Sequence, residues 1–312
     1  MQSWLDIWGK DPRIQLIDLG GRADPLEMMY VIRHKLKGFL PVKTLVIAGY
    51  GYAEFDPPRA EYSNLQSFVK LAGGLMPLAN ELKSIKWNQW ALPDLQFKAL
   101  TEQEMGDFSD QFGWRTITSR VDVSYRVTPT SFAEYLNQLG DSSRQKYFKR
   151  RQKLKKYGSL ELIDSVSEVE FFNQLNQFHL TRWGRPCYSR DSMEFFSLFL
   201  KRIKDEGGVP IMQYMKVANE IVAVLFDVIW NGVRYNLQSG YIERRFPQIA
   251  LGAIHLGLAI EKSINDNLVY DLLAGHGKHT NYKEKISTQI IPMNSYCLTR
   301  GWLKDIYRLY GK

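Results

Sequence analysis

Two short segments near the C-terminal end of the chain combine residue types that could carry out acyl transfer. Residues 270–275 form an apolar run that contains the carboxylate Asp271, and Tyr282 and Lys283 follow after a loop with His276. Transfer of an acyl group to an amine or hydroxyl requires one group that accepts a proton and another that protonates the leaving thiolate. A carboxylate or histidine and a tyrosine hydroxyl are suited to these roles. The simpler alternatives are an ordinary loop histidine and an amphipathic-helix tyrosine whose hydroxyl reaches solvent.

A second candidate site lies where a predicted strand at 233–239 leads through a loop into a predicted helix at 249–264. The start of a helix presents unpaired backbone N–H groups and the positive end of the helix dipole, and both attract phosphate groups. Arg244 and Arg245 in the loop could add charge to a phosphate or pyrophosphate site. The segment contains neither a P-loop nor a GxGxxG motif. An ordinary strand-to-helix turn with solvated arginines is the alternative.

A third group of candidates ends a predicted helix at 166–183. His179 and Arg182 are three residues apart and therefore share a helix face, and Trp183 could form the wall of an apolar pocket. A metal site is not indicated, because the five histidines of the chain show no ligand spacing. The sequence has no GxSxG motif, and Cys187 lacks the neighbours of a nucleophile.

A strongly basic segment lies near the middle of the chain. Residues 144–156 contain eight arginines and lysines and no acidic residue. The apolar residues Tyr147, Phe148, Leu154 and Tyr157 are spaced as in a helix with one buried stripe, which predicts a basic helix over 142–157. Such a helix could bind nucleic acid or an anionic membrane surface, or it could be a solvated connector.

The composition is that of a folded protein with an excess of positive charge. The chain has 312 residues, a formal net charge of +8 and 45% hydrophobic residues, which allows one large domain or two ordinary ones. The two cysteines are far apart in sequence, as expected for a protein of a reducing compartment rather than a disulfide scaffold. No apolar run approaches the roughly 20 residues of a membrane span, and the N-terminus does not resemble a signal peptide. We therefore expect a cytoplasmic protein.

The pattern after the basic segment predicts a regular order of elements. Helices at 166–183 and 192–204 precede three strands at 209–217, 220–230 and 233–239, which the Asn231-Gly232 pair and a similar turn join into an antiparallel meander. A helix at 249–264, a strand at 268–273, a helix at 279–286, a strand at 288–298 and a helix at 302–309 follow.

The N-terminal part shows a similar succession. The pattern predicts strands at 13–19, 27–33, 43–48, 85–91 and 114–127, and helices at 63–83, 101–111 and 130–138. Because the two parts have a similar order of elements, we expect a duplicated α/β fold with mixed sheets. The boundary is expected near 135–142.

Several of these features together resemble the GNAT-superfamily acetyltransferases of the CelD-like type, distant relatives of the FemAB aminoacyltransferases. The resemblance extends over about 140–290 and rests on the following motifs: Phe178-x-x-x-Arg182-Trp183, Ser239-Gly240-Tyr241, Phe246-Pro247-x-x-x-Leu251, Tyr270-Asp271-Leu272-Leu273-x-Gly275 and Tyr282-Lys283. Trp4-Leu5-x-x-Trp8 and residues 51–56 look like the family's N-terminal half. Gln248 and Ile242 depart from the family pattern, which usually has glycine after the loop proline and often an acidic residue after Gly-Tyr.

The resemblance implies two tandem GNAT-like halves, 1–140 and 141–312, each with a mixed, mostly antiparallel sheet flanked by helices. It also implies roles for individual residues. Tyr282 corresponds to the tyrosine that protonates the thiolate, and Asp271 or His179 would accept a proton. A backbone N–H near Gln238 would stabilise the oxyanion. The implied acyl-CoA site comprises Gln238, Ser239, Gly240, Arg244, Arg245, Gln248 and Gly252, and the implied acceptor site comprises Arg182, Trp183, Tyr241, His276 and Lys283.

The sequence therefore predicts an acyltransferase that uses acetyl-CoA or another acyl-CoA and no metal. By resemblance, its acceptor would be a bacterial polysaccharide, an exopolysaccharide or another envelope precursor. Aminoacyl transfer from charged tRNA, which the basic helix would bind, is one alternative. A GNAT fold that serves only as a binding module is another.

Overall fold

The computed structural model describes residues 1–19, 28–52, 74–96, 102–275 and 282–310. The chain forms two compact units. Unit 1 comprises residues 1–123 and 291–312, and unit 2 comprises residues 124–290. These units do not coincide with the predicted halves 1–140 and 141–312, because the last strand, β11 (Gln289–Thr299), pairs with β4 (Gln89–Gln96) of unit 1.

Unit 2 contains most of the candidate site residues. Its elements in chain order are α5 (Phe132–Gln138), α6 (Asp141–Arg144), the π-helix η2 (Gln145–Lys149), α7 (Arg151–Leu154), β6 (Leu160–Asp164), α8 (Glu168–Trp183), α9 (Arg190–Asp205), β7 (Val209–Val217), β8 (Glu220–Trp230), β9 (Val233–Tyr241), α10 (Leu251–Asn265), β10 (Val269–Asp271) and the 3-10 helix η3 (Glu284–Ile286).

The sheet of unit 2 grows from two tight hairpins. β6, β7, β8 and β9 pair antiparallel in this order, and β10 then pairs parallel to β9 and antiparallel to β5 (Arg115–Val127). Both turn residues of each hairpin, Ala218-Asn219 and Asn231-Gly232, have positive φ. Such turns match the right-handed twist of the strands they join. The predicted meander is therefore confirmed.

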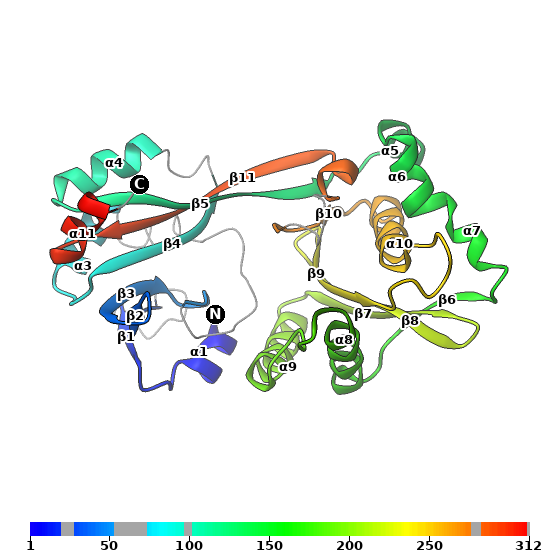
Figure 1. Ribbon diagram of the computed structural model, residues 1–312, viewed down its shortest axis with the longest axis horizontal. Coiled ribbons are helices and arrows are strands. Elements are labelled where there is room, and N and C mark those ends of the chain that lie inside the picture. Colours follow the sequence, from blue (N-terminus) through cyan, green and yellow to red (C-terminus); the bar gives the residue numbers. More distant parts are fainter. Residues whose placement is uncertain (20–27, 53–73, 97–101, 276–281, 311–312) are drawn as a thin grey trace. The chain divides into compact units, whose positions relative to one another are not determined.

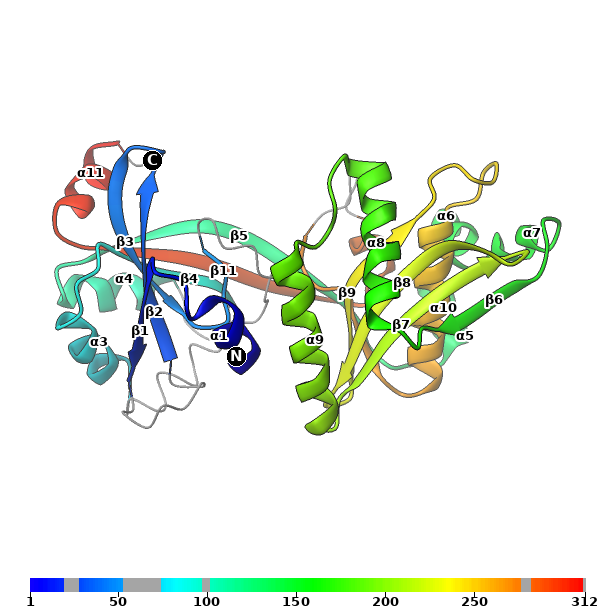
Figure 2. The same ribbon diagram turned by 90° about the horizontal axis from the view of Figure 1, so that it is seen from below.

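Helices cover the two faces of this sheet (Figures 1 and 2). On one face, α8 and α9 pack through an aromatic core that includes Phe171, Phe172, Phe196 and Phe226. On the other face, α10 buries Leu251 and Ile254 against β7 and β8. Serines cap α8 and α9, since Ser167 and Ser189 accept hydrogen bonds from backbone N–H groups of the first turn. The burial of these apolar faces fixes α8 and α10, which carry candidate site residues, against the sheet.

Unit 1 has its own helices and core. Its elements are α1 (Gln2–Trp8), β1 (Ile14–Asp18), β2 (Met28–Leu36), β3 (Leu40–Ile47), α3 (Leu75–Lys83), β4 (Gln89–Gln96), α4 (Glu102–Gln111), most of β5 (Arg115–Val127), most of β11 (Gln289–Thr299) and α11 (Trp302–Tyr310). Trp4 stacks on Tyr30 in its core, with ring centroids 4.7 Å apart. No helix in the described ranges is long and apolar enough to cross a membrane.

The strands hydrogen-bond in the order β1-β2-β3-β4-β11-β5-β10-β9-β8-β7-β6, which makes one mixed, mostly antiparallel sheet. The predicted fold class, mixed sheets flanked by helices, is confirmed. Two elements, α1 and β6, were not predicted. The helix predicted at 279–286 is a 3-10 helix over Glu284–Ile286, and residues 279–281 of that prediction lie outside the described ranges.

Candidate active site

The last part of β9 separates from its neighbour. β10 pairs with β9 only through Val269–Asp271, which face Val233–Tyr235, whereas β9 continues to Tyr241 alongside β8. β10 ends because the chain turns away, with positive φ at Leu273 and Gly275. Beyond Tyr235, β9 therefore has a partner strand on one side only among the described residues. A free strand edge of this kind can hydrogen-bond an extended ligand.

A β-bulge lies where the two strands separate. The register shifts between Phe226 and Asp227, so that Leu237 is an extra residue in β9. A bulge breaks the ladder locally and redirects backbone groups, and it is frequent next to active sites. The bulge lies in the part of β9 that the family resemblance assigns to acyl-CoA binding.

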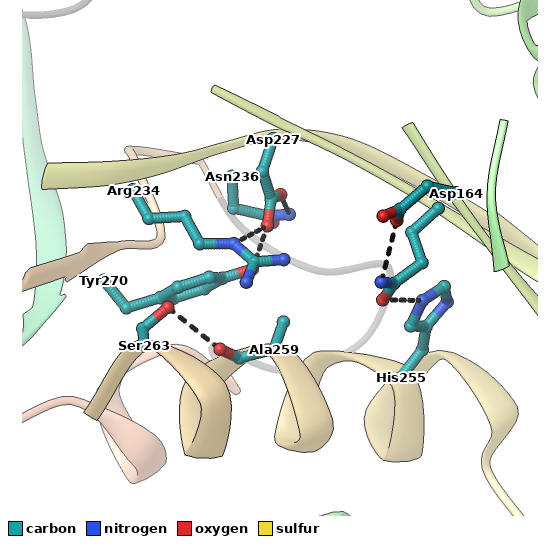
Figure 3. Close-up of polar contacts among 9 residues, drawn as sticks. Asp164, Asp227, Arg234, Asn236, His255, Ala259, Ser263 and Tyr270 are labelled. Carbon is teal, nitrogen blue, oxygen red and sulfur yellow. Dashed lines mark hydrogen bonds and ion pairs between the residues drawn. The ribbon is translucent and has the colours of Figure 1, made fainter. Parts of the chain in front are cut away.

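A buried ion pair holds this bulge (Figure 3). Arg234 Nε lies 2.6 Å from Asp227 Oδ2, and the side chain of Asn236 donates to Asp227 Oδ1 at 2.8 Å. Tyr270 of β10 donates its hydroxyl to the same carboxylate at 3.2 Å. Asp227 is fully buried and Arg234 is 3% exposed. One carboxylate on β8 thus binds residues of β9 and β10 at the point where these two strands part.

Burial raises the pKa of the Asp227 carboxyl, although Arg234, Asn236 and Tyr270 all act to lower it. A buried carboxylate without such partners would cost several kcal/mol. Sequence reasoning did not single out Asp227 or Arg234. The sequence could have indicated the contact between Asp227 and Asn236, because the Asn231-Gly232 turn sets a strand register that puts these two residues opposite each other.

The start of α10 is the second component of the site. The helix has Ala250 at its N-cap and no side-chain cap, so its first backbone N–H groups have no capping partner on a side chain. Before it, Gln248 has φ +60, and its carbonyl oxygen accepts a hydrogen bond from Arg150 at 2.9 Å. Uncapped N–H groups at a helix start are suited to binding phosphate.

Gly252 in the first turn of α10 permits a close contact with the end of β9. A Cβ atom at this position would lie 2.4 Å from the ring of Tyr241. The glycine therefore lets the Tyr241 ring lie directly against the start of the helix. β9 and α10 are thereby held together.

The two arginines predicted to bind phosphate have different surroundings. The Arg245 guanidinium binds Glu220 at 2.7 Å, and the Glu220 partnership raises its pKa. Arg244 is exposed and has φ +57. The role of either residue toward a phosphate stays a prediction, and Arg245 would have to leave Glu220 to fulfil it.

An aromatic and charged cluster closes the site at the end of β9. The Arg182 guanidinium lies 4.7 Å from the ring centroid of Tyr241 and 4.9 Å from that of Trp183, and its Nε is 2.7 Å from Glu243. Burial raises the pKa of Tyr282; Tyr241 adds to this shift and Arg182 opposes it. The structure thus brings together four residues predicted to form the site. Tyr282 keeps its proton at neutral pH, as an acid requires.

Tyr147 of the basic segment joins this cluster, which sequence reasoning did not foresee. Its side chain is buried, and burial followed by the effect of Tyr282 raises its pKa. The π-helical turn places both Tyr147 and Phe148 inside the protein. Inserted π turns are frequent at functional sites.

His179 lies on α8 beside β9. Its Nε2 is 3.0 Å from the carbonyl oxygen of Ser239, and since a carbonyl can only accept, Nε2 must donate. In the neutral ring, Nδ1 is then the nitrogen that can accept a proton. Burial, with a smaller effect of Arg182, lowers the pKa of His179 and favours the neutral ring. A Cβ at Gly240 would lie 3.0 Å from Phe178 Cβ, so this glycine permits the close approach of α8.

Asp271 and Lys283 stabilise the turn after β10. The buried Asp271 carboxylate lies 2.6 Å from Arg126 Nε, 3.2 Å from Ser124 Oγ and 2.8 Å from the backbone nitrogen of Leu273. Lys283 is 9% exposed and donates to the carbonyl oxygens of Leu273 and Ala274 at 3.1 and 2.5 Å. Both groups have structural partners here, and their predicted catalytic and acceptor-binding roles stay predictions.

Gln238 and His276 were also predicted as site residues. Gln238 lies in β9, where its side-chain oxygen accepts the backbone N–H of Ser239 at 3.0 Å. His276 lies outside the described residues. No group of three or more potential metal ligands occurs within the described ranges.

A second buried histidine, His255, lies on α10 under the sheet (Figure 3). Its Nε2 is 3.3 Å from Gln213 Oε1, and its Nδ1 is buried without a hydrogen-bond partner. Burial, with a contribution from Arg234, lowers its pKa to about 3. His255 is therefore neutral in the folded protein at neutral pH.

Comparison with known families agrees with this geometry. Residues 141–284 match the model of the acetyltransferase (GNAT) domain, Acetyltransf_6. The matched segment includes the splayed part of β9, the start of α10, β10 and Tyr282. No curated protein matches the chain.

Solved structures share the fold over nearly the whole chain. A crystal structure of FemX has a TM-score of 0.58 at 13% identity, covering 100% of this chain and 94% of that one. The C-terminal domain (DUF2156) of a putative lysylphosphatidylglycerol synthetase from Agrobacterium fabrum has a TM-score of 0.53 at 8% identity, covering 99% and 94%. A conserved protein of unknown function from Bacteroides thetaiotaomicron has a TM-score of 0.52 at 11% identity, covering 96% and 88%. These likenesses concern the fold alone.

Residues 141–284 are thus a GNAT acetyltransferase domain of the CelD-like family, as the sequence motifs predicted. The protein is an acyltransferase, and a GNAT domain implies an acyl-CoA co-substrate.

Proposed function

We propose that this protein transfers an acyl group, most simply acetyl, from acyl-CoA to an amine or hydroxyl of a bacterial polysaccharide or envelope precursor. The observation that carries the proposal is the free edge of β9 after its bulge, next to the uncapped start of α10. Acyl-CoA carries a thioester on an extended arm, and a pyrophosphate follows this arm. The arm would bind to the strand edge and the pyrophosphate to the helix start.

The donor would pair its pantetheine arm with β9 along residues 236–241. The pyrophosphate would accept hydrogen bonds from backbone N–H groups at 248–252, where the helix dipole favours negative charge. With the bulge at Leu237, a backbone N–H near Gln238 would face the thioester carbonyl and stabilise its oxyanion. These placements use the free strand edge and the uncapped helix start together.

Tyr282 would protonate the leaving thiolate. Its raised pKa keeps the phenol protonated, and its place in the Arg182–Tyr241 cluster puts it near the end of β9. We assign the proton acceptor to His179 rather than Asp271. Nδ1 of the neutral His179 ring can accept a proton, whereas the Asp271 carboxylate already binds Arg126, Ser124 and a backbone N–H.

The acceptor class rests on the CelD-like resemblance, since proteins of this type are associated with cellulose and exopolysaccharide synthesis. Trp183 supports it, because this residue ends α8 beside the cluster and is 45% exposed. An exposed aromatic ring next to a charged cluster is suited to a hydroxyl-rich ligand with one apolar face. Arg182 and Tyr241 would supply polar contacts to it.

The donor site can be tested with one pair of glycine variants. Gly252→Ala would push the new Cβ into the Tyr241 ring, whereas Gly106→Ala on α4 has nothing within 4 Å. We expect wild type and Gly106→Ala to bind acetyl-CoA alike in isothermal titration, and Gly252→Ala to bind at least about tenfold more weakly. No binding of acetyl-CoA by the wild type at millimolar concentration would refute the donor assignment.

Aminoacyl transfer from charged tRNA is a second candidate, favoured by the exposed lysines of the basic segment, Lys149, Lys153, Lys155 and Lys156. It predicts RNA binding that weakens steeply with salt. Titration of total tRNA into the protein at two salt concentrations, with acetyl-CoA in parallel, separates the two donors.

A further inference from the structure

Three cations from two segments gather beside the predicted pyrophosphate site. Lys146 lies in η2, Arg150 caps the end of η2 and the start of α7, and Lys285 lies in η3. Arg150 reaches the pyrophosphate loop directly, since it donates to the carbonyl oxygen of Gln248 at 2.9 Å. η2 packs closely on α10, because a Cβ at Gly257 would lie 2.3 Å from the carbonyl oxygen of Tyr147.

Side-chain contacts also join η3 to η2. Tyr135 donates its hydroxyl to the carbonyl oxygen of Ile286 at 2.8 Å, and its ring lies 5.9 Å from that of Phe148. Lys285 and Lys146 are therefore on neighbouring turns that share Tyr135 as a packing partner. The Lys146 ammonium lies 5.4 Å from the ring centroid of Tyr147.

The cluster carries positive charge that carboxylates do not neutralise. Nearby Arg144 pairs with Asp141 and Arg151 with Glu261, but no ion pair involves Lys146, Arg150 or Lys285 within the part of the chain that the structure describes. Lys146 is half-buried, and burial, followed by the charges of Lys285 and Arg150, lowers its pKa. Holding like charges together and partly out of water costs free energy. An anion bound between the charges would offset this cost.

We infer that Lys146, Arg150 and Lys285 bind the 3′-phosphate on the ribose of CoA. This inference rests on the proposed acyl-CoA donor. If the pyrophosphate lies at residues 248–252, the ribose and its phosphate monoester leave the helix start within reach of Arg150. A phosphate monoester carries a charge near −2 and three acceptor oxygens, which suits three converging cations.

A compact dianion fits this cluster better than a polymer does. The half-burial of Lys146 limits contact to one small group, whereas a nucleic-acid backbone needs a row of exposed cations. Lys153, Lys155 and Lys156 form such a row on the same segment and take no part in the cluster. They also provide a control with equal charge.

The test compares CoA with 3′-dephospho-CoA by isothermal titration at fixed salt. Lys146→Gln, Lys285→Gln and the double variant probe the cluster, and Lys155→Gln/Lys156→Gln removes two charges outside it. Lys285 is exposed, so its variant is expected to fold normally. We expect wild type to bind CoA roughly tenfold or more tightly than dephospho-CoA. The double cluster variant should lose this preference and keep its affinity for dephospho-CoA, while the control variant retains the preference.

Each other outcome has a definite meaning. Equal wild-type affinity for both ligands would overturn the inference and leave the proposed donor intact. Equal weakening of both ligands by the cluster variant, or by cluster and control variants alike, would also overturn it. Loss of tRNA binding in the cluster variant with unchanged CoA binding would assign the cluster to nucleic acid instead. Failure of wild type to bind either ligand would refute the proposed function itself.

Discussion

Replacing Asp227 tests whether one buried carboxylate holds the donor-binding part of the sheet. Asp227→Asn keeps the shape of the side chain but removes the charge that lies 2.6 Å from Arg234. The guanidinium, 3% exposed, would stay in the interior without its counter-ion. Breaking a buried pair in this way costs about 3–5 kcal/mol, a large part of a typical unfolding free energy of about 5–15 kcal/mol.

The same reasoning predicts a rescue of stability without a rescue of binding. Asp227→Leu combined with Arg234→Met removes both charges, and such replacements are often neutral or stabilising. The bulge would still lack the carboxylate that binds Asn236 and Tyr270. The double variant should therefore recover most of the lost unfolding free energy and bind acetyl-CoA more weakly than wild type.

Urea-induced unfolding measures the first effect, and hydrogen exchange of peptides that cover β8 and β9 assigns it to this sheet. The exposed pair of Glu220 and Arg245 at the other end of β8 is the matched control, and Glu220→Gln should change stability little. If Asp227→Asn and Glu220→Gln have equally small effects, the carboxylate does not hold the bulge. If the double variant binds acetyl-CoA as wild type does, the network has no part in positioning the donor.

Three further predictions follow from individual side chains. Tyr282→Phe should lower kcat about 100-fold or more and leave the Kd for acetyl-CoA unchanged, and equal kcat values would exclude Tyr282 as the acid. Lys283→Met should lower the unfolding free energy by about 1–3 kcal/mol, because the carbonyls of Leu273 and Ala274 lose their donor; a rise in acceptor KM at unchanged stability would instead support direct acceptor binding. The pKa of His255 is about 3 when folded and near 6.5 when unfolded, so the unfolded state binds the extra proton between these values. Stability should therefore fall as pH drops below about 6.5, by up to about 1.4 kcal/mol per pH unit, and His255→Gln should flatten this slope in denaturation curves at pH 5 to 7.5.

Sequence patterns predicted the elements of unit 2 where local signals and burial agree. The hairpin turns at 218–219 and 231–232 fix β7, β8 and β9 because their residues adopt positive φ. α8 and α9 carry apolar faces and serine caps. β6 was not predicted, because its side chains are mostly exposed and its sequence shows no buried face. Its pairing with β7 makes it a strand.

The basic segment shows what helical periodicity cannot predict. The pattern predicted one helix over 142–157, and the structure has helical turns there with a π-helix at Gln145–Lys149. Tyr147 and Phe148 are buried, as the predicted apolar stripe required, whereas Tyr157 of the same stripe is 43% exposed. The absence of a side chain at Gly257, 110 residues away, makes room for this turn.

Distant partners also bear on which residue would accept the proton in acyl transfer. The sequence left Asp271 and His179 open as the proton acceptor, but Ser124 and Arg126, on a strand about 145 residues earlier, occupy the Asp271 carboxylate. A carboxylate that already accepts from three donors has little capacity left for a further hydrogen bond with an acceptor. Tyr282 instead lies among Tyr147, Tyr241 and Arg182, where burial keeps its hydroxyl protonated. The acid is therefore best sought at Tyr282, and the base on α8 at His179, whose hydrogen bond to Ser239 leaves Nδ1 as the accepting nitrogen.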